Sequence, residues 1–163
     1  MQANPPTRTQ ADEYLEHYRT TLASISGVVS TPNRVVSIIL SDCVARASEA
    51  GIKPTLEIYL GKNFSINAVD LTVLLGNTIE NALRALSEVP EDNGRSLHIM
   101  LRQRENFLIY EISNKYVPRA KVPARRGYGL RNVRECVKKY HGELKFSENG
   151  EVYTVTAILQ ISG

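Results

Sequence analysis

Few features of this sequence point to export, metal binding or a membrane span. Two cysteines, Cys43 and Cys136, lie far apart and form no CxxC or His/Cys cluster. Neither a disulfide framework nor a zinc site is indicated, so we expect both to be reduced core thiols. No run approaches the ~18 apolar residues of a membrane-spanning helix, and the polar start of the chain does not resemble a secretory signal. These absences predict a soluble, cytoplasmic domain without membrane contact.

The composition is otherwise that of a globular protein of about one domain. The chain has 163 residues, is 42% hydrophobic and carries a formal net charge of +3, which argues against disorder. The charge is unevenly distributed, because the stretch from Lys115 to Lys145 holds ten basic and two acidic residues, whereas the remainder is net acidic. This asymmetry indicates an anionic partner: a nucleic acid, an acidic protein surface or a polyphosphate ligand. A solvated basic helix face explains it equally well.

Apolar residues at three- and four-residue spacing predict four helices. They are expected over residues 10–26, from Val35 to a stop at Gly51, over 68–86, and from Gly127 to a stop near Gly142. Thr31-Pro32 supplies a capping residue and a proline at the start of the second helix. Asn67 or Asp70 caps the third, which has the strongest pattern.

Alternating apolar and polar residues predict five strands. They are expected over residues 56–60, 97–101, 107–112, 143–147 and 153–161, with the second and third joined as a hairpin across 104–106. Residues 114–126 contain two prolines, five basic residues and no acid, so they are expected to form a long, functional loop. The order of elements predicts an α/β (α+β) two-layer sandwich, with helices covering one face of a largely antiparallel sheet.

Two amides and a guanidinium share one face of the third helix. Asn77, Asn81 and Arg84 lie at spacings of four and three, among apolar residues. Amides are costly to bury unless they bind something. Asparagine oxygens suit a hard cation such as Mg²⁺, and an arginine one turn further along suits a phosphate. The alternative is that both amides hydrogen-bond to neighbouring backbone.

A glycine pair stands between the basic loop and the fourth helix, in Arg126-Gly127-Tyr128-Gly129-Leu130. Backbone amides at a helix N-terminus bind phosphate, and glycines allow the backbone to approach it closely. The segment matches neither the GxxxxGK[ST] phosphate loop nor a dinucleotide-binding fingerprint. Taken alone, it is also explained as a simple turn into a helix.

Taken together, the two clusters resemble a known family. The segment LGNTIENALR (residues 75–84), followed about 45 residues later by GYGLRNV (127–133) and Tyr140-His141-Gly142, looks like the Bergerat-type, or GHKL, ATP-binding fold of gyrase, heat-shock chaperones, histidine kinases and MutL. The resemblance covers roughly residues 33–161. It is closest to the catalytic domains of sensor histidine kinases, in particular the peptide-pheromone quorum-sensing group.

The resemblance implies ATP and Mg²⁺ as cofactors and a role for each cluster. Asn81 falls where the family holds Mg²⁺, and Asn77 where it lines the triphosphate, at a place where hydrolysing members carry a glutamate base. The absence of that glutamate fits a kinase that transfers phosphate to a protein. The nucleotide-binding residues implied by the resemblance are Asn77, Asn81, Arg84, Asn114, Arg126, Gly127, Tyr128, Gly129 and Leu130.

One motif departs from the family pattern. Most members have Asp-x-Gly-x-Gly after a strand, with the aspartate accepting a hydrogen bond from the adenine amino group, whereas this chain has Asn114-Lys115-Tyr116. Asn114 can still accept through its amide oxygen, and the pheromone-sensing group resembles this chain in using asparagine there. The lost charge and glycines imply weaker adenine binding.

The phosphoacceptor histidine is not evident in this chain. His98 lies in a strand pattern and His141 at a helix end, so both are expected to be structural. His17 lies on the helix expected over residues 10–26, but its neighbours lack the acceptor motif, and the segment resembles the second dimerisation helix of a histidine kinase. No catalytic residue is therefore assigned.

The resemblance implies two parts. Residues 1–30 are expected to be a helical remnant of the dimerisation region, able to pair in a homodimer, and residues 31–163 the ATP-binding domain. The implied partners are a phosphoacceptor helix of the same membrane-bound kinase, lying upstream, and a response regulator.

Three other readings remain open. A module with a degenerate nucleotide site could bind an acidic protein without catalysis, and a stand-alone serine kinase would share the fold. A nucleic-acid binder is the least favoured, because few stacking aromatics other than Tyr116 and Tyr128 accompany the basic residues.

Overall fold

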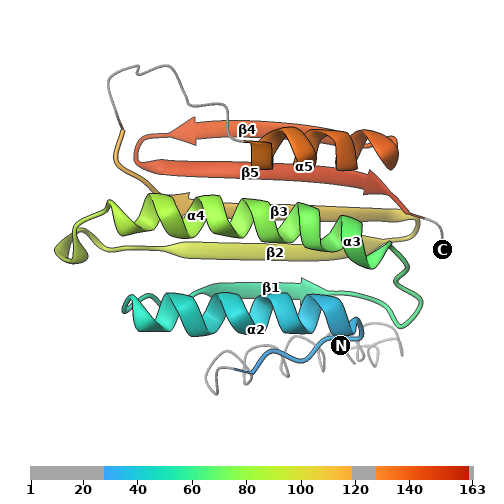
Figure 1. The fold of residues 1–163 in the computed structure, drawn as a ribbon, viewed down its shortest axis with the longest axis horizontal. Helices are drawn as coiled ribbons and strands as arrows, with labels where there is room; N and C mark the ends of the chain where they lie inside the picture. Colours follow the sequence, from blue (N-terminus) through green and yellow to red (C-terminus); the bar gives the residue numbers. More distant parts are fainter. Residues whose placement is uncertain (1–27, 119–127, 162–163) are drawn as a thin grey trace, which may run out of the picture.

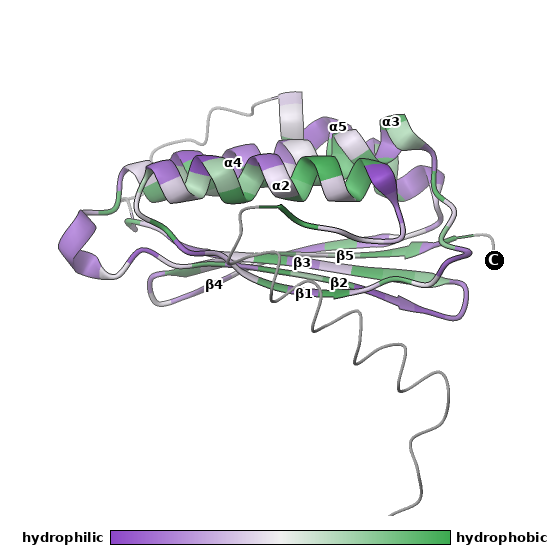
Figure 2. Cartoon of the chain, turned by 90° about the horizontal axis from the view of Figure 1, so that it is seen from below, coloured by the Kyte–Doolittle hydropathy of each residue, from purple (hydrophilic) through white to green (hydrophobic). Residues whose placement is uncertain are grey.

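The computed structural model describes residues 28–118 and 128–161 and has two layers. A five-stranded sheet forms one layer, and the helices of the described residues lie on one side of it (Figure 1, Figure 2). The predicted α/β two-layer sandwich is therefore confirmed. The helix expected over residues 10–26 and most of the basic loop, residues 119–127, lie outside the described residues.

The helical elements are α2 (Arg34–Glu49), α3 (Ala68–Leu71), the π-helical turn η1 (Thr72–Gly76), α4 (Asn77–Ser87), the short 3₁₀ helix η2 (Glu91–Asn93) and α5 (Tyr128–Lys139). The strands are β1 (Thr55–Tyr59), β2 (Leu97–Arg104), β3 (Phe107–Lys115), β4 (Glu143–Asn149) and β5 (Val152–Gln160). They lie in the order β1-β2-β3-β5-β4. Only β1 and β2 are parallel, and the other described neighbours are antiparallel.

Helix α2 begins within one residue of the predicted Val35, but its cap is a different residue from the one predicted. Asn33, in an extended conformation, accepts a hydrogen bond from Val36 N at 3.0 Å through its side chain. Thr31, the predicted cap, instead donates its hydroxyl to the carbonyl of Asn33 at 2.8 Å. The helix therefore starts after Asn33, and the Thr31 hydroxyl is engaged by the turn that precedes it.

The segments α3, η1 and α4 follow one another without a break and form one long rod, as the apolar pattern predicts. Asn67, one of the two predicted caps, accepts from Val69 N at 2.8 Å and Asp70 N at 3.4 Å. The π-helical turn η1 was not predicted. Turns of this kind are rare and concentrate at functional sites, and this one ends directly before Asn77.

The core lies between the sheet and the helices, where side chains alternate along each strand. On β3, Leu108, Tyr110 and Ile112 are buried against the helical layer. The Tyr110 hydroxyl lies 2.6 Å from the Thr78 hydroxyl, which joins β3 to the first turn of α4. Both cysteines are free and buried, as predicted, and burial raises the pKa of Cys43 to about 12 and that of Cys136 to about 11.

Strand β3 continues to Lys115, so the prediction that a loop starts at Asn114 is wrong. Asn114 pairs with Leu97 on β2 and with Tyr153 on β5. Because β3 pairs with a strand on each side, the sheet extends it beyond the end that its own sequence pattern predicts. Within the described residues, no helix has the length and apolar character to cross a membrane.

Candidate functional site

The rod formed by α3, η1 and α4 lies beside α5, and the two run in opposite directions (Figure 1). Near its start, α5 approaches Asn77. Near its end, it contacts Asp70, which lies at the start of the rod. Figure 1 also shows that α5 begins part-way along α4, so the C-terminal half of α4 extends past it. The helix pair therefore has two ends, and polar residues lie at both.

Asn77 and Gly129 bring the two sequence motifs into contact. A Cβ atom on Gly129 would lie 3.0 Å from Oδ1 of Asn77, closer than side chains normally pack. The Asn77 Nδ2 group donates to the carbonyl of Val73 at 2.8 Å, which fixes the orientation of its amide. Glycine at position 129 thus allows the N-terminus of α5 to lie directly against Asn77.

Asn81 and Arg84 lie further along α4. Asn81 is half-buried and Arg84 exposed, and neither side chain has a hydrogen bond or ion pair with another residue in the described ranges. Glu80, which lies between the two motif asparagines, pairs with Arg46 of α2 at 2.7 Å. The alternative that both amides bond to backbone therefore holds for Asn77 alone, and the Asn81 amide is available to a ligand.

Asn114 lies near the end of β3, on the face that packs against the helices. It is one of two buried polar residues in the described core, with 3% of its surface exposed. Its Nδ2 donates to the carbonyl of Lys115 at 2.9 Å. The amide oxygen has no hydrogen bond within the described ranges, so it can accept one from a ligand.

The remaining predicted binding residues are at or before the start of α5. Tyr128 is 80% exposed, while Leu130 is half-buried. Arg126 and Gly127 lie outside the described residues. The structure therefore describes seven of the nine predicted nucleotide-binding residues and places Asn77 against Gly129.

The two histidines of the described ranges lie outside the two sequence motifs. Nε2 of His98 lies 2.9 Å from Oε1 of Glu57, across the β1–β2 pair. His141 follows α5 in the left-handed conformation, with φ of 49°. His17 lies outside the described residues. That His98 and His141 are structural stays a prediction.

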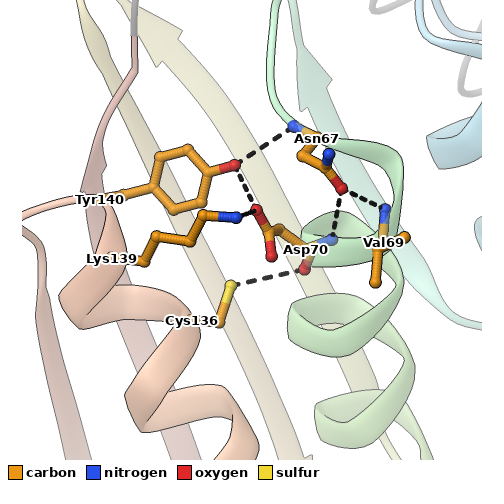
Figure 3. A network of polar contacts seen from close by, with 6 residues as sticks. All are labelled: Asn67, Val69, Asp70, Cys136, Lys139 and Tyr140. Atoms are coloured by element: carbon orange, nitrogen blue, oxygen red, sulfur yellow. Dashed lines mark hydrogen bonds and ion pairs between the residues drawn. The ribbon is translucent and has the colours of Figure 1, made fainter.

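The other end of the helix pair is a closed polar network, shown in Figure 3. Oδ2 of Asp70 accepts hydrogen bonds from the Tyr140 hydroxyl at 2.6 Å and from the Lys139 ammonium at 2.7 Å. The Cys136 thiol donates to the carbonyl of Asp70 at 3.5 Å, and Asn67 N donates to the Tyr140 hydroxyl at 3.2 Å. These bonds join the end of α5 to the first turn of α3 and to its cap.

The network also sets the charge state of Asp70. Burial raises the pKa of this carboxyl, but the hydrogen bonds from Lys139 and Tyr140 more than offset burial and leave the pKa below its ordinary value. Asp70 is therefore ionised at neutral pH. Sequence reasoning considered Asp70 only as a possible cap, because nothing in the sequence shows that Tyr140 lies beside it.

A metal bound near Asn81 would depend on few protein ligands. No group of three or more His, Cys, Asp or Glu residues that could hold a metal occurs in the described part of the chain. Mg²⁺ in nucleotide sites typically takes one or two protein oxygens, together with phosphate and water. The unengaged amide of Asn81 fits that requirement.

Residues 66–160 match the GHKL domain family. The chain belongs to this family. The match includes both sequence motifs, the rod, β2, β3, α5 and the final hairpin. None of the curated proteins is significantly similar to the chain in sequence.

Solved structures of histidine kinases have the same fold as this GHKL domain. The Acinetobacter baumannii histidine kinase AdeS is 17% identical, with a TM-score of 0.62 over 98% of this chain and 88% of that one. The catalytic domain of histidine kinase ThkA is 12% identical, with a TM-score of 0.61 over 78% and 92% of the two chains. The histidine kinase domain of the Erythrobacter litoralis EL346 blue-light activated kinase is 13% identical, with a TM-score of 0.57 over 96% and 76%.

These similarities confirm the Bergerat-type fold and are consistent with an ATP-binding kinase domain. Among the predicted binding residues, Asn81 and Arg84 of α4 have no described side-chain partner, and the amide oxygen of Asn114 at the end of β3 has none. The arrangement offers amide oxygens from two layers of the fold and a guanidinium. Such a set can bind a nucleotide and a hard cation without further acidic ligands.

Proposed function

We propose that this GHKL domain binds ATP·Mg²⁺ and donates the γ-phosphate to a histidine on another segment of a two-component sensor kinase. The observation that carries the proposal is the contact of Asn77 with Gly129, beside Asn81, whose amide has no described partner. This contact brings a helix N-terminus suited to phosphate against α4, the helix that also carries Asn81, whose amide suits Mg²⁺.

The residues would share the nucleotide as follows. The amide oxygen of Asn81 would hold Mg²⁺, which on binding neutralises charge on the phosphate oxygens. Asn77 and the start of α5, at Gly129 and Leu130, would line the triphosphate. The exposed Arg84 guanidinium would contact a phosphate. Arg126, Gly127 and Tyr128 belong to the same motif and complete the proposed binding set.

Asn77 also bears on the reaction type. An amide cannot accept a proton from water at neutral pH, whereas a glutamate at this position could act as a general base. Its Nδ2 is moreover engaged by the carbonyl of Val73. Transfer to a protein nucleophile is therefore favoured over ATP hydrolysis.

Asn114 would recognise the base. With Nδ2 held by the carbonyl of Lys115, the amide presents oxygen, which accepts from the 6-amino group of adenine and offers no donor to the 6-oxo group of guanine. A neutral acceptor binds this amino group less strongly than a carboxylate. Asparagine at this position supports placing the chain in the peptide-pheromone quorum-sensing group.

The rest of the kinase is proposed on the same basis. Residues 31–163 would form the catalytic domain, and residues 1–30 a remnant of the second dimerisation helix that could mediate a homodimer. The partners would be a phosphoacceptor helix of the same kinase, in its cytoplasmic portion, and a response regulator.

Calorimetry with Mg·ATP tests the proposal, using Asn81→Ala and the control Glu80→Gln. Glu80 is the adjacent residue on α4 but pairs with α2, so its substitution should leave binding unchanged. We expect metal-dependent, adenine-selective binding in the parent and the control, reduced at least ~100-fold in Asn81→Ala. Equal binding by Asn81→Ala would show that the metal assignment is wrong.

Two further results would decide between the proposed function and its alternatives. Absence of binding or thermal protection up to several millimolar Mg·ATP would indicate a protein-interaction module, since a ligand specific for the folded state must raise its stability. If the domain phosphorylates a partner, acid-labile product indicates phosphohistidine, whereas acid-stable product indicates a serine kinase.

A further inference from the structure

The Asp70 network holds the C-terminal end of α5, and the N-terminal end of α5 faces the proposed phosphate site. Asp70 lies in the first turn of α3, and its side chain is only 14% exposed. It binds the Tyr140 hydroxyl and the Lys139 ammonium, which follow one another at the end of α5 (Figure 3). These contacts lie one helix length away from Gly129.

The spacing of the contacts along the two helices is matched. From Gly129 to Tyr140, α5 advances about 16 Å, and from Asn67 to Asn77 the rod advances about 15 Å, at 1.5 Å per residue. Gly129 meets Asn77 at one end, and Tyr140 meets Asn67 and Asp70 at the other. A shift of α5 along the rod at one end would therefore appear at the other.

Apolar contacts alone would specify this register weakly. Val133 and Val137 of α5 are buried, but apolar packing has no directional requirement comparable to a hydrogen bond. The hydrogen bonds to Oδ2 of Asp70 do have one. The carbonyl of Tyr140 also accepts from Gln160 N at 2.9 Å, so the sheet holds the same residue.

We propose that Asp70 is a positioning residue for the phosphate-facing end of the site. By holding Tyr140 and Lys139, it sets the register of α5 and so keeps Gly129 against Asn77. This inference rests on the proposed ATP site. It concerns the triphosphate and not the base, because Asn114 lies on β3 and is held by the carbonyl of Lys115.

The test compares a ligand that has phosphates with one that lacks them. Binding of Mg·ATP and of adenosine is measured by NMR titration for the parent, Asp70→Ala and Tyr140→Phe. Tyr140→Phe keeps the ring and removes only the hydroxyl, so it remains informative if Asp70→Ala fails to fold. Lys138→Met is the matched control, since Lys138 lies on the same helix, is 74% exposed and pairs with Glu135.

We expect both network variants to bind Mg·ATP about tenfold more weakly, with less than a twofold change for adenosine. The amide resonance of Gly129 should shift in both variants and stay in place in Lys138→Met. Equal losses for ATP and adenosine would overturn the inference and leave Asp70 a purely structural role. Unchanged Mg·ATP binding in the variants would overturn it while leaving the proposed function intact.

If the parent itself does not bind Mg·ATP, the proposed function fails first, and the positioning role fails with it. That outcome is recognised from the parent alone. It cannot be confused with a failure confined to the variants.

Discussion

Both ends of the helix pair carry polar residues, but these residues are bonded differently. At the Asp70 end, the carboxylate, the tyrosine hydroxyl and the ammonium are bonded to one another between the two helices. At the other end, where Gly129 lies against Asn77, the nearby α4 residues Asn81 and Arg84 have no side-chain partner in the described ranges. Polar groups that partner one another hold a fold together, whereas polar groups left without partners beside a core are available to a ligand. One helix pair thus joins a structural end to a binding end.

Gly142→Ala should break the structural end and have the largest effect. A Cβ atom at this position would lie 2.3 Å from the carbonyl oxygen of Ile158 and 2.9 Å from Cγ1 of Val137, and backbone cannot yield cheaply. We expect a loss of about 3 kcal/mol in the free energy of unfolding, measured by urea denaturation. Gly76→Ala is the control, because Gly76 is helical with open space around it, and the change should be neutral or stabilising. Similar losses in the two variants would contradict this account.

Gly129→Ala should act on the binding end. The new Cβ would displace the Asn77 amide by a few tenths of an ångström, while alanine favours the helix more than glycine. We expect about a tenfold loss of Mg·ATP affinity, or ~1.4 kcal/mol, with a smaller change in stability. Calorimetry and thermal melting separate the two quantities, with the exposed Glu135→Ala on the same helix as control. A stability loss as large as that of Gly142→Ala would show that the two ends do not differ.

Tyr110→Phe probes the contact that fixes the rod over the sheet. It removes the hydrogen bond to the Thr78 hydroxyl, which keeps its bond to the carbonyl of Leu74 at 2.7 Å. Burial raises the pKa of Tyr110, so the phenol is protonated over the whole working pH range. We expect a loss of about 1 kcal/mol in unfolding experiments. A double-mutant cycle with Thr78→Val should show coupling, and additive effects would rule out a direct contribution from the bond.

Acidification should weaken the Asp70 end, with the smallest effect. Because the pKa of folded Asp70 lies below its ordinary value of 3.8, its contribution is present above that value and is lost as the pH falls through the folded pKa. The stability difference between the parent and Asp70→Asn should stay constant from about pH 8 to about pH 5, at less than ~1 kcal/mol, and shrink below about pH 4. A difference that grew on acidification would contradict the direction of the shift.

Local pattern was enough to predict much of the fold, and the misses have physical causes. The apolar repeat of residues 68–86 predicted the rod because core packing requires the same stripe that the repeat supplies. The cap of α2 was missed by two residues because the side chain of Asn33, and not that of Thr31, accepts from the first turn of the helix. The end of β3 was missed because Asn114 is held in the sheet by two neighbouring strands.

The candidate site divides in the same way. The family motifs predicted Asn77, Asn81 and Gly129 as binding residues, and the structure places Asn77 against Gly129. Asp70 and Tyr140 were not associated, since they are distant in sequence and only the antiparallel packing of α5 brings them within 2.6 Å. The π-helical turn between Asp70 and Asn77 was not predicted from the residue spacing.

The sequence by itself determined the two-layer fold and the GHKL motifs, because apolar periodicity and glycine placement are local properties. Tertiary structure alone decided which polar residues are already engaged. Asp70 became a structural residue because Lys139 and Tyr140 fold onto it, whereas no described residue bonds to the amide of Asn81. Hydrogen bonding is satisfied between elements, and the distances between elements exist only in the folded chain.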